Sequence, residues 1–285
     1  MAGMTPPVPL QQSRAFVRAA RRLAWPVHER AAAGLRWVET RRTLPGMGAV
    51  ALVSRGPLGA AADWLAAPGG LKVLNADGPD PATLRAAGWW PLLTPGTVAL
   101  LPLGDADSLR AGLSGKWRNR LARAEEAGMR VTRRPLPPDP DHWVLAAEAR
   151  QARARGYRGW PPRLAAAYAA ATPGGAQLFV AERAGVPLAG LVLLVHEGSA
   201  TWQIGVSGPE GRQAGAMPLL LWRAMLWAAA RGLAQLDLGT LNTDDAPGLA
   251  RFKLGTGARA HRLGGTWLHA GALAPLARRL PRAWT

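Results

Sequence analysis

The chain has 285 residues, enough for two domains of ordinary size, and 48% of them are apolar, which supports a substantial core. Its formal charge of +17 at neutral pH attracts polyanions such as tRNA, nucleotides, pyrophosphates and anionic lipid headgroups. An arginine-rich composition without a dedicated site would give the same charge. The sequence has no cysteine, which excludes structural disulfides, thiolate zinc sites and cysteine acyl-enzymes.

The N-terminal residues 1–12 lack a charged segment leading into an apolar run, so no signal peptide is predicted. The most apolar stretch, residues 219–233, is interrupted by Arg223 and Arg231 and does not resemble a membrane span. These features predict a cytoplasmic protein with no transmembrane segment. Its positive charge leaves peripheral contact with an anionic membrane open.

The first half of the chain alternates predicted helices and strands. A helix is expected at residues 13–23, and strands at 35–40 and 48–53 flank the turn signal Pro45-Gly46 and form a hairpin. The expected elements that follow are a helix at 57–66, a strand at 71–74, a helix from Asp80, a strand at 97–101, helices within 105–127 and a strand at 129–133. This order predicts a mixed α/β lobe.

The Pro-rich stretch 135–140 is the clearest linker, and the domain boundary is placed there. Beyond it, the expected elements are helices at 141–155 and 161–171, an antiparallel meander at 177–182, 187–196 and 200–206, a helix at 216–231, a strand at 235–238, a helix at 246–254 and a strand at 262–268. The predicted fold is α/β (α+β), with two lobes, residues 1–134 and 141–269, and a tail at 270–285. Each lobe is expected to hold a mixed, mostly antiparallel sheet flanked by helices.

Several well-known site motifs are absent. The sequence contains no Gly-x-Ser-x-Gly, Walker phosphate loop, Gly-x-Gly-x-x-Gly or His-Glu-x-x-His motif, and its five histidines show no ligand spacing. Serine-hydrolase, P-loop kinase, Rossmann and zincin functions are therefore disfavoured, and no metal is expected.

Three segments carry a joint pattern. The first comprises Gln12-Ser13, residues 41–45 and residues 54–57; the second comprises residues 116–121, Ala124-Glu125 and Gly128; the third comprises residues 218–222, Gly232, residues 237–239, residues 251–253 and Gly257. In this order across most of the chain, they resemble the Fem-like branch of the GNAT N-acetyltransferase superfamily, whose FemABX members build peptidoglycan bridges.

This resemblance implies two GNAT-like lobes and an acyltransferase that moves an acyl or aminoacyl group to an amine. Fem enzymes take the group from aminoacyl-tRNA to the peptide stem amine of a cell-wall precursor. Relatives that use acyl-CoA share the fold, so the donor stays open between acyl-CoA and aminoacyl-tRNA. Either donor is anionic, and amine attack on it needs a neutral amine and help for a developing oxyanion.

Lys253 and Asp237 are the candidates for catalytic roles. Lys253 matches the family's Phe-Lys pair and can place positive charge at a phosphate or at the oxyanion, with Phe252 as a wall of the site; an exposed helical lysine beside a core phenylalanine is the alternative. Asp237 ends an apolar strand, where its carboxylate can orient the amine or accept a proton, or else cap the next helix. Lys253 is one of only three lysines among 35 basic residues, the others being Lys72 and Lys116.

Other residues are candidates for binding substrate or donor. Arg212 and Gly215 fall where acetyltransferases bind the CoA pyrophosphate at a helix start, although Met217 departs from the small residue usual there, and an ordinary loop is the alternative. Lys116 and Arg118 lie on a basic helix that can contact phosphates or simply face solvent. The remaining candidates are Arg55 in the Arg-Gly-Pro turn, Tyr157 in a substrate-facing loop, and Trp202 as a stacking platform.

Two other functions compete with aminoacyl transfer. One is acetyl-CoA-dependent N-acetylation of a small molecule or protein on the same fold. The other is RNA binding without catalysis, which predicts salt-dependent binding that survives Lys253→Ala. The sequence has no sustained heptads and therefore lacks the long helical arm that some tRNA-using Fem enzymes carry.

Overall fold

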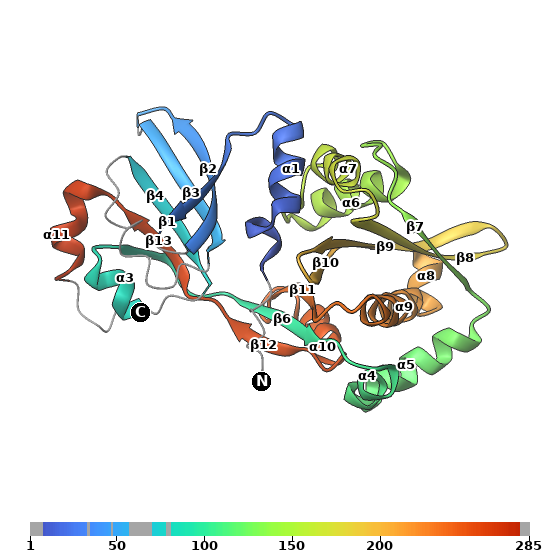
Figure 1. The fold of residues 1–285 in the computed structure, drawn as a ribbon. Helices are drawn as coiled ribbons and strands as arrows, with labels where there is room; N and C mark the ends of the chain where they lie inside the picture. The colour runs from blue at the N-terminus through green and yellow to red at the C-terminus, as the bar shows by residue number, and fades with distance from the viewer. Residues whose placement is uncertain (1–7, 33–34, 47, 57–69, 78–80, 280–285) are drawn as a thin grey trace. The chain divides into compact units, whose positions relative to one another are not determined.

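The computed structural model describes residues 8–32, 35–46, 48–56, 70–77 and 81–279 (Figure 1). The chain divides into two compact units. The C-terminal lobe comprises residues 98–261 together with 1–10, and the N-terminal lobe comprises residues 11–97 and 262–285. Each lobe holds one mixed sheet with helices beside it, which confirms the predicted two-lobed α/β fold.

The lobes divide the chain elsewhere than at the Pro-rich stretch 135–140. That stretch lies inside the C-terminal lobe, directly after β7 (Arg130–Pro135). The reason is strand pairing, because β7 is hydrogen-bonded to β8 (Ala176–Arg183), with Arg130 opposite Glu182 and Pro135 opposite Gln177. The proline content of residues 135–140 correctly indicates a loop, but the boundary of the lobe is set by the pairing of strands that are distant in sequence.

The N-terminal lobe is built on a sheet with the strand order β1-β2-β3-β4-β13-β5. Its strands are β1 (Val27–Ala32), β2 (Leu35–Leu44), β3 (Gly48–Gly56), β4 (Leu71–Ala76), β5 (Trp90–Leu93) and β13 (Gly265–His269), and its helices include α1 (Arg14–Arg22), α3 (Pro81–Ala86) and α11 (Ala274–Ala277). β2 and β3 form the predicted hairpin, with Thr40 opposite Leu52, while β3 and β4 run parallel. The buried core of this lobe includes Trp37, Val53, Leu74, Leu84, Trp89 and Trp267.

Gln12 fastens the N-terminal segment to this sheet. Its side chain is buried, and Nε2 donates to the carbonyl oxygens of Ser54 (2.7 Å) and Val38 (3.2 Å). Its Oε1 accepts from the N–H of Val38 (2.8 Å). One amide thus satisfies three backbone groups of β2 and β3.

We expect Gln12→Ala to destabilise the N-terminal lobe by about 1–3 kcal/mol, because buried backbone groups lose their hydrogen-bond partner. Urea unfolding followed by tryptophan fluorescence measures the change. Gln213→Ala, at an exposed glutamine, is the matched control and should leave the unfolding midpoint in place. Equal midpoints for Gln12→Ala and the wild type would contradict this role of Gln12.

The C-terminal lobe is built on a sheet with the strand order β12-β6-β11-β10-β9-β8-β7. Its further strands are β6 (Thr97–Pro102), β9 (Val186–His196), β10 (Ser199–Ser207), β11 (Gln235–Leu241) and β12 (Arg259–Arg262). Its helices are α4 (Ala106–Gly112), α5 (Gly115–Glu126), α6 (Trp143–Arg155), α7 (Pro162–Ala171), α8 (Pro209–Gln213), α9 (Ala216–Ala230) and α10 (Pro247–Leu254). Strands β8 to β10 form the predicted antiparallel meander.

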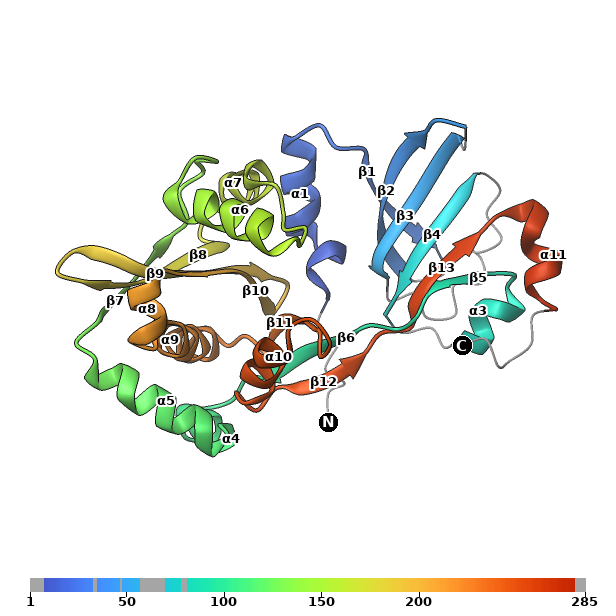
Figure 2. The same cartoon turned by 180° about the vertical axis from the view of Figure 1, so that it is seen from behind.

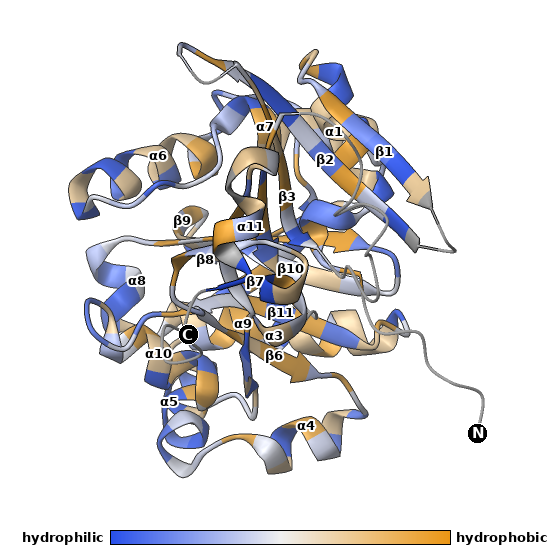
Figure 3. Cartoon of the chain, turned by 90° about the vertical axis from the view of Figure 1, so that its left-hand side faces the viewer, coloured by the Kyte–Doolittle hydropathy of each residue, from blue (hydrophilic) through white to orange (hydrophobic). Residues whose placement is uncertain are grey.

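Helices cover both faces of this meander. α6 and α7 lie on one side and α8 and α9 on the other (Figure 2). Accordingly, β8 and β9 contain unbroken buried runs, at residues 176–181 and 188–194, instead of alternating, as expected for a sheet covered on both faces. α5 buries Trp117, Leu121 and Ala124 on one face, and hydrophilic residues make up much of the rest of the helix (Figure 3).

Some elements differ from the sequence-based expectation. The strand expected at 262–268 is two strands in different sheets, because Gly265 turns the chain with φ +88°, and a Cβ there would lie 2.9 Å from the Leu93 carbonyl oxygen. β1 was not expected, since its sequence alternates only weakly. The helix expected at 57–66 lies outside the described residues. Within the described ranges, no helix has both the length and the apolar character needed to cross a membrane.

Candidate active site

The parallel strands β10 and β11 separate in the middle of the C-terminal sheet. They pair only from Ser199 opposite Gln235 to Thr201 opposite Asp237, although β10 continues to Ser207 and β11 to Leu241. The register of β10 with β9 also shifts between Trp202 and Ile204. Beyond Thr201 and Asp237, backbone groups facing this gap are therefore available to other partners.

Lys253 lies beside the end of β11. It is the penultimate residue of α10 and is 7% exposed. Its Nζ donates to the carbonyl oxygen of Thr240 (2.7 Å) and lies 5.9 Å from the centre of the Trp202 ring. Burial lowers the pKa of Lys253 from 10.5 to about 8, while the negative charge of Asp237 opposes that shift. At neutral pH the side chain is thus still mostly an ammonium ion.

Asp237 shapes the turn that leads to Lys253. The carboxylate is buried, and Oδ1 accepts from the N–H of Gly239 (2.7 Å). Gly239 has φ +79°, a conformation that favours glycine, and a Cβ there would lie 3.6 Å from Lys253 Nζ. The alternative that Asp237 caps the next helix is wrong, because the N-cap position of α10 is Ala246. Asp237 holds the turn and supplies negative charge near Lys253.

Aromatic rings enclose one side of Lys253. Phe252 meets Trp202 edge-on at 6.1 Å between ring centres and lies 5.7 Å from Trp117 on α5. The Trp202 indole donates through Nε1 to the Ile204 carbonyl oxygen (2.8 Å). It lies against Gly205, where a Cβ would come within 2.7 Å of the ring. Trp202 and Phe252 are therefore held in place beside Lys253, and the role of Phe252 as a wall of the site stays a prediction.

Tyr157 lies on the loop between α6 and α7, where it joins a polar network. Its hydroxyl donates to Glu148 Oε1 (2.8 Å) and accepts from Gln151 Nε2 (3.0 Å). Gln151 Nε2 also lies within hydrogen-bond distance of Glu148 Oε2 (3.3 Å) and of the Gly205 carbonyl oxygen (3.1 Å). The network thus reaches the same stretch of β10 that supports Trp202.

Arg212 and Gly215 lie between β10 and α9, as the sequence indicated. Arg212 is exposed on the short helix α8, and its Nη1 donates to the Ser207 carbonyl oxygen (2.6 Å). It lines a cavity of about 540 Å³ that also contains Gln151. Gly215, with φ +71°, precedes α9, and a Cβ there would lie 3.2 Å from Ala124 of α5. Gly215 is thus needed for close packing of the two helices. The structure gives neither residue a contact with Lys253.

Three other candidates lie apart from Lys253 in the described contacts. Lys116 and Arg118 are on the exposed face of α5, where Arg118 Nη1 donates to the Leu113 carbonyl oxygen (2.6 Å). Arg55 belongs to the N-terminal lobe, where its guanidinium pairs with Asp77 at 2.8 Å. The structure therefore brings together Lys253, Asp237, Phe252 and Trp202 and leaves these three outside that group.

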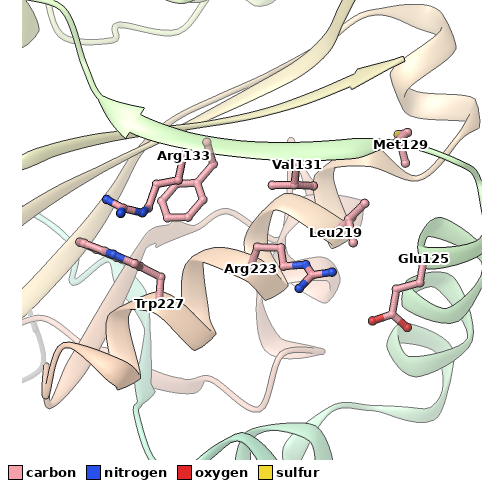
Figure 4. A pocket seen from close by; sticks show the side chains of 8 residues that line it. Glu125, Met129, Val131, Arg133, Leu219, Arg223 and Trp227 are labelled. Carbon is pink, nitrogen blue, oxygen red and sulfur yellow. The ribbon is translucent and has the colours of Figure 1, made fainter. Parts of the chain in front are cut away.

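A separate cavity of about 390 Å³ lies between α5, β7, β8 and α9 (Figure 4). The side chains of Glu125, Arg133 and Arg223 line it, with Phe179 and Trp227 among the apolar ones. None of the predicted site residues lines this cavity. In the described part of the chain, no group of three His, Asp or Glu side chains is placed to hold a metal ion.

Sequence reasoning missed Glu148, Gln151 and Trp117 as neighbours of the site. A signal for Glu148 was present: Val144, Leu145 and Ala152 form the buried stripe of α6, and Glu148 occupies the same stripe. A carboxylate at such a position is seldom buried without a purpose. Trp117 carried no such signal, because its spacing with Leu121 and Ala124 is that of an ordinary core residue.

The arrangement suits acyl transfer. A buried cation stands at the gap between two strands, where it can stabilise negative charge on a reacting carbonyl oxygen or on a donor phosphate. The aromatic rings around it exclude water and strengthen that interaction. The order of elements in this lobe is also the one expected from the sequence: β7 is followed by two helices, an antiparallel meander, α9, β11 and α10.

Comparison with solved structures places this architecture. FemX superposes with a TM-score of 0.74 over 96% of each chain at 14% identity. The C-terminal domain of a putative lysylphosphatidylglycerol synthetase from Agrobacterium fabrum gives 0.56 at 16% identity, over 94% of this chain and 91% of that one. A tandem GNAT protein from the clavulanic acid biosynthesis pathway superposes with a TM-score of 0.53 at 15% identity, over 93% of this chain and 90% of that one. These likenesses are of fold. No curated protein sequence matches the chain.

The fold and the site define an acyltransferase of the acetyltransferase type. The model of the acetyltransferase (GNAT) domain family matches residues 113–259, more than half of the chain, and the chain belongs to that family. The match begins just before α5 and ends in β12, so it lies within the C-terminal lobe that holds Lys253. The sequence-based prediction of a GNAT enzyme with a Fem-like, two-lobed fold is thereby confirmed.

Proposed function

We propose that the protein transfers an acyl or aminoacyl group from an anionic donor to an amine, with the reacting carbonyl in the gap between β10 and β11. Lys253 supplies positive charge to the carbonyl oxygen or to a donor phosphate. Asp237 keeps that lysine charged and holds the turn at Gly239. Trp202 and Phe252 wall the site.

The observation that carries this proposal is the incomplete hydrogen bonding of Lys253. An ammonium ion has three N–H donors, and in the described structure only the Thr240 carbonyl oxygen accepts one. A buried cation with unused donors is costly, so such a group is usually satisfied by a ligand. A developing oxyanion or a phosphate oxygen provides that partner.

The proposed acceptor class draws on solved structures with a similar fold. FemX has this fold over nearly the whole chain, and another similar structure is the C-terminal domain of a putative lysylphosphatidylglycerol synthetase. These likenesses, with the Fem-like sequence pattern, support aminoacyl transfer onto a cell-wall or lipid precursor. The net charge of +17 suits an anionic donor and a precursor at an anionic membrane surface, and we place the reaction on the cytoplasmic side.

The donor is decided by binding. A ligand that binds only the folded protein is expected to raise its stability by about 2.7 kcal/mol at 100 times its Kd. Thermal unfolding with acetyl-CoA, a longer acyl-CoA, alanyl-tRNA and uncharged tRNA as control compares the classes. A higher Tm with a CoA ester assigns acyl-CoA as donor, and a higher Tm with alanyl-tRNA beyond that with uncharged tRNA assigns aminoacyl-tRNA. No shift with either class would contradict the proposed donors.

A further inference from the structure

Glu148 is a buried carboxylate that the proposed function does not use. It is 9% exposed and lies on the stripe of α6 that faces the sheet. No arginine or lysine lies within ion-pair distance of it in the described structure; its hydrogen-bond partners are Tyr157 and Gln151. A buried charge without a cationic partner lowers stability, so a purely structural role does not account for it.

The loop between α6 and α7 closes over this carboxylate. Tyr157 places its hydroxyl 2.8 Å from Glu148 Oε1, and a Cβ on Gly159 would lie 3.2 Å from the same oxygen. The loop therefore passes close to Glu148 at Gly159. Tyr157 itself is 40% exposed. Its hydroxyl connects the buried carboxylate to the outside of the lobe.

The network ends at the strand gap. Gln151 hydrogen-bonds to the carbonyl oxygen of Gly205, which lies on the part of β10 that β11 no longer pairs with. The Trp202 ring covers Gly205 and also lies 5.9 Å from Lys253 Nζ. The network of Glu148, Tyr157 and Gln151 on α6 and its following loop thus ends on the unpaired part of β10, the strand that also carries the Trp202 ring beside Lys253.

The surroundings of Glu148 and Tyr157 shift the pKa of both side chains. Burial raises the pKa of Glu148, while the hydroxyl of Tyr157, the charge of Arg155 and the amide of Gln151 act against that shift. Burial also raises the pKa of Tyr157, which therefore keeps its proton at neutral pH. A carboxylate whose pKa is raised toward neutral pH is better matched to the work of a general base, and the hydroxyl of Tyr157 is in direct hydrogen-bond contact with it.

We propose that Tyr157 and Glu148 form the proton relay for the acceptor amine, with Tyr157 touching the amine and Glu148 acting through it. As the amine nitrogen bonds to the donor carbonyl carbon, the carbonyl–oxygen or carbonyl–sulfur bond to the donor breaks. The amine proton passes to the Tyr157 oxygen, and the Tyr157 proton passes to Glu148. The leaving alkoxide or thiolate takes a proton from water, and Glu148 returns its proton to water.

This inference rests on the proposed function, and one assay separates them. The probes are acetyl-CoA or alanyl-tRNA as donor and a lysine-containing peptide as amine, with the N-acylated peptide measured by mass spectrometry. Glu148→Gln keeps the shape and removes the base, so kcat is expected to fall ~100-fold, as for loss of general base catalysis. The kcat of Tyr157→Phe should fall by a similar factor. The kcat of the double variant should fall no further, since the two residues act as one unit.

The pH profile distinguishes the relay from a structural role. In the wild type, activity should rise with pH as Glu148 loses its proton, above the ordinary range for a glutamate. Glu148→Gln should lack this rise. Glu126→Gln, at an exposed carboxylate of α5, is the control and should keep the wild-type rate and profile.

The outcomes separate cleanly. An active wild type whose rate and pH profile survive in Glu148→Gln overturns the relay and leaves the proposed function standing. A wild type that acylates the peptide with neither donor overturns the proposed function and the relay together. A folded Glu148→Ala variant whose rate is restored by added formate supports the relay, because a small carboxylate then replaces the missing side chain.

Discussion

Replacing Lys253 with alanine is expected to lower the rate of acyl transfer by about 10²–10³-fold, the range found when one oxyanion-stabilising donor is lost. The reason is that no other cation contacts this part of the gap in the described structure: Lys253 alone lies over the Trp202 ring and at the Thr240 carbonyl oxygen. Initial rates of product formation measure the loss. CoA release can be followed with a thiol reagent, because the chain has no cysteine of its own.

Arg251→Ala is the matched control for this experiment. Arg251 lies on α10, two residues before Lys253, but is exposed, so its removal tests the loss of a basic residue without touching the site. Its rate should stay at the wild-type level, and the Tm of both variants should show that they are folded. Full activity of Lys253→Ala would remove Lys253 from the mechanism.

A second substitution of Lys253 is expected to raise the stability of the protein, whereas Lys253→Ala lowers its activity. Lys253→Met should make the protein more stable at pH 7, by about 1–3 kcal/mol, because methionine fills the space without the cost of a buried charge. The pKa of Lys253 is about 8 in the folded protein, against 10.5 for the ordinary group. Between these pH values the unfolded chain binds more protons than the folded one. Wild-type stability therefore rises with pH from about 8 to 10.5, and is lost again as pH falls through that window.

The check is urea unfolding of the wild type and of Lys253→Met at pH 7 and pH 10. The advantage of the variant should shrink at the higher pH, where the lysine of the wild type is neutral in the fold. Arg251→Met serves as the control for adding an exposed methionine. A Lys253→Met variant that is less stable by the same amount at both pH values would show that the charge of Lys253 costs nothing.

Much of the fold could be predicted from local signals. The turn at Pro45-Gly46 and the apolar spacing of α5 and α9 depend on neighbouring residues, so the corresponding hairpin and helices were expected correctly. The extent of each lobe could not be predicted in this way. It depends on β6 and β7 pairing with strands far along the chain, and on β13 returning to the N-terminal sheet.

The candidate site divides in the same manner. Phe252 and Lys253 are adjacent in sequence and became candidates through the family pattern, whereas Asp237 on β11 became one through its place at the end of an apolar strand. Tertiary contacts decide which of the proposed binding residues lie near Lys253, and the local sequence does not show them. Trp202 lies beside Lys253, whereas Lys116 is exposed on α5. Glu148 was not among the predicted site residues, although it shares the buried stripe of α6 with Val144, Leu145 and Ala152.

The most direct test of the central claim is detection of the product. The wild-type protein is incubated with a lysine-containing peptide and either acetyl-CoA or alanyl-tRNA, and the peptide mass is measured beside that from Lys253→Ala. The account predicts a mass increase of one acyl or aminoacyl group with the wild type and little or none with the variant. An unchanged peptide with both donors, or equal acylation by the variant, would contradict acyl transfer at Lys253.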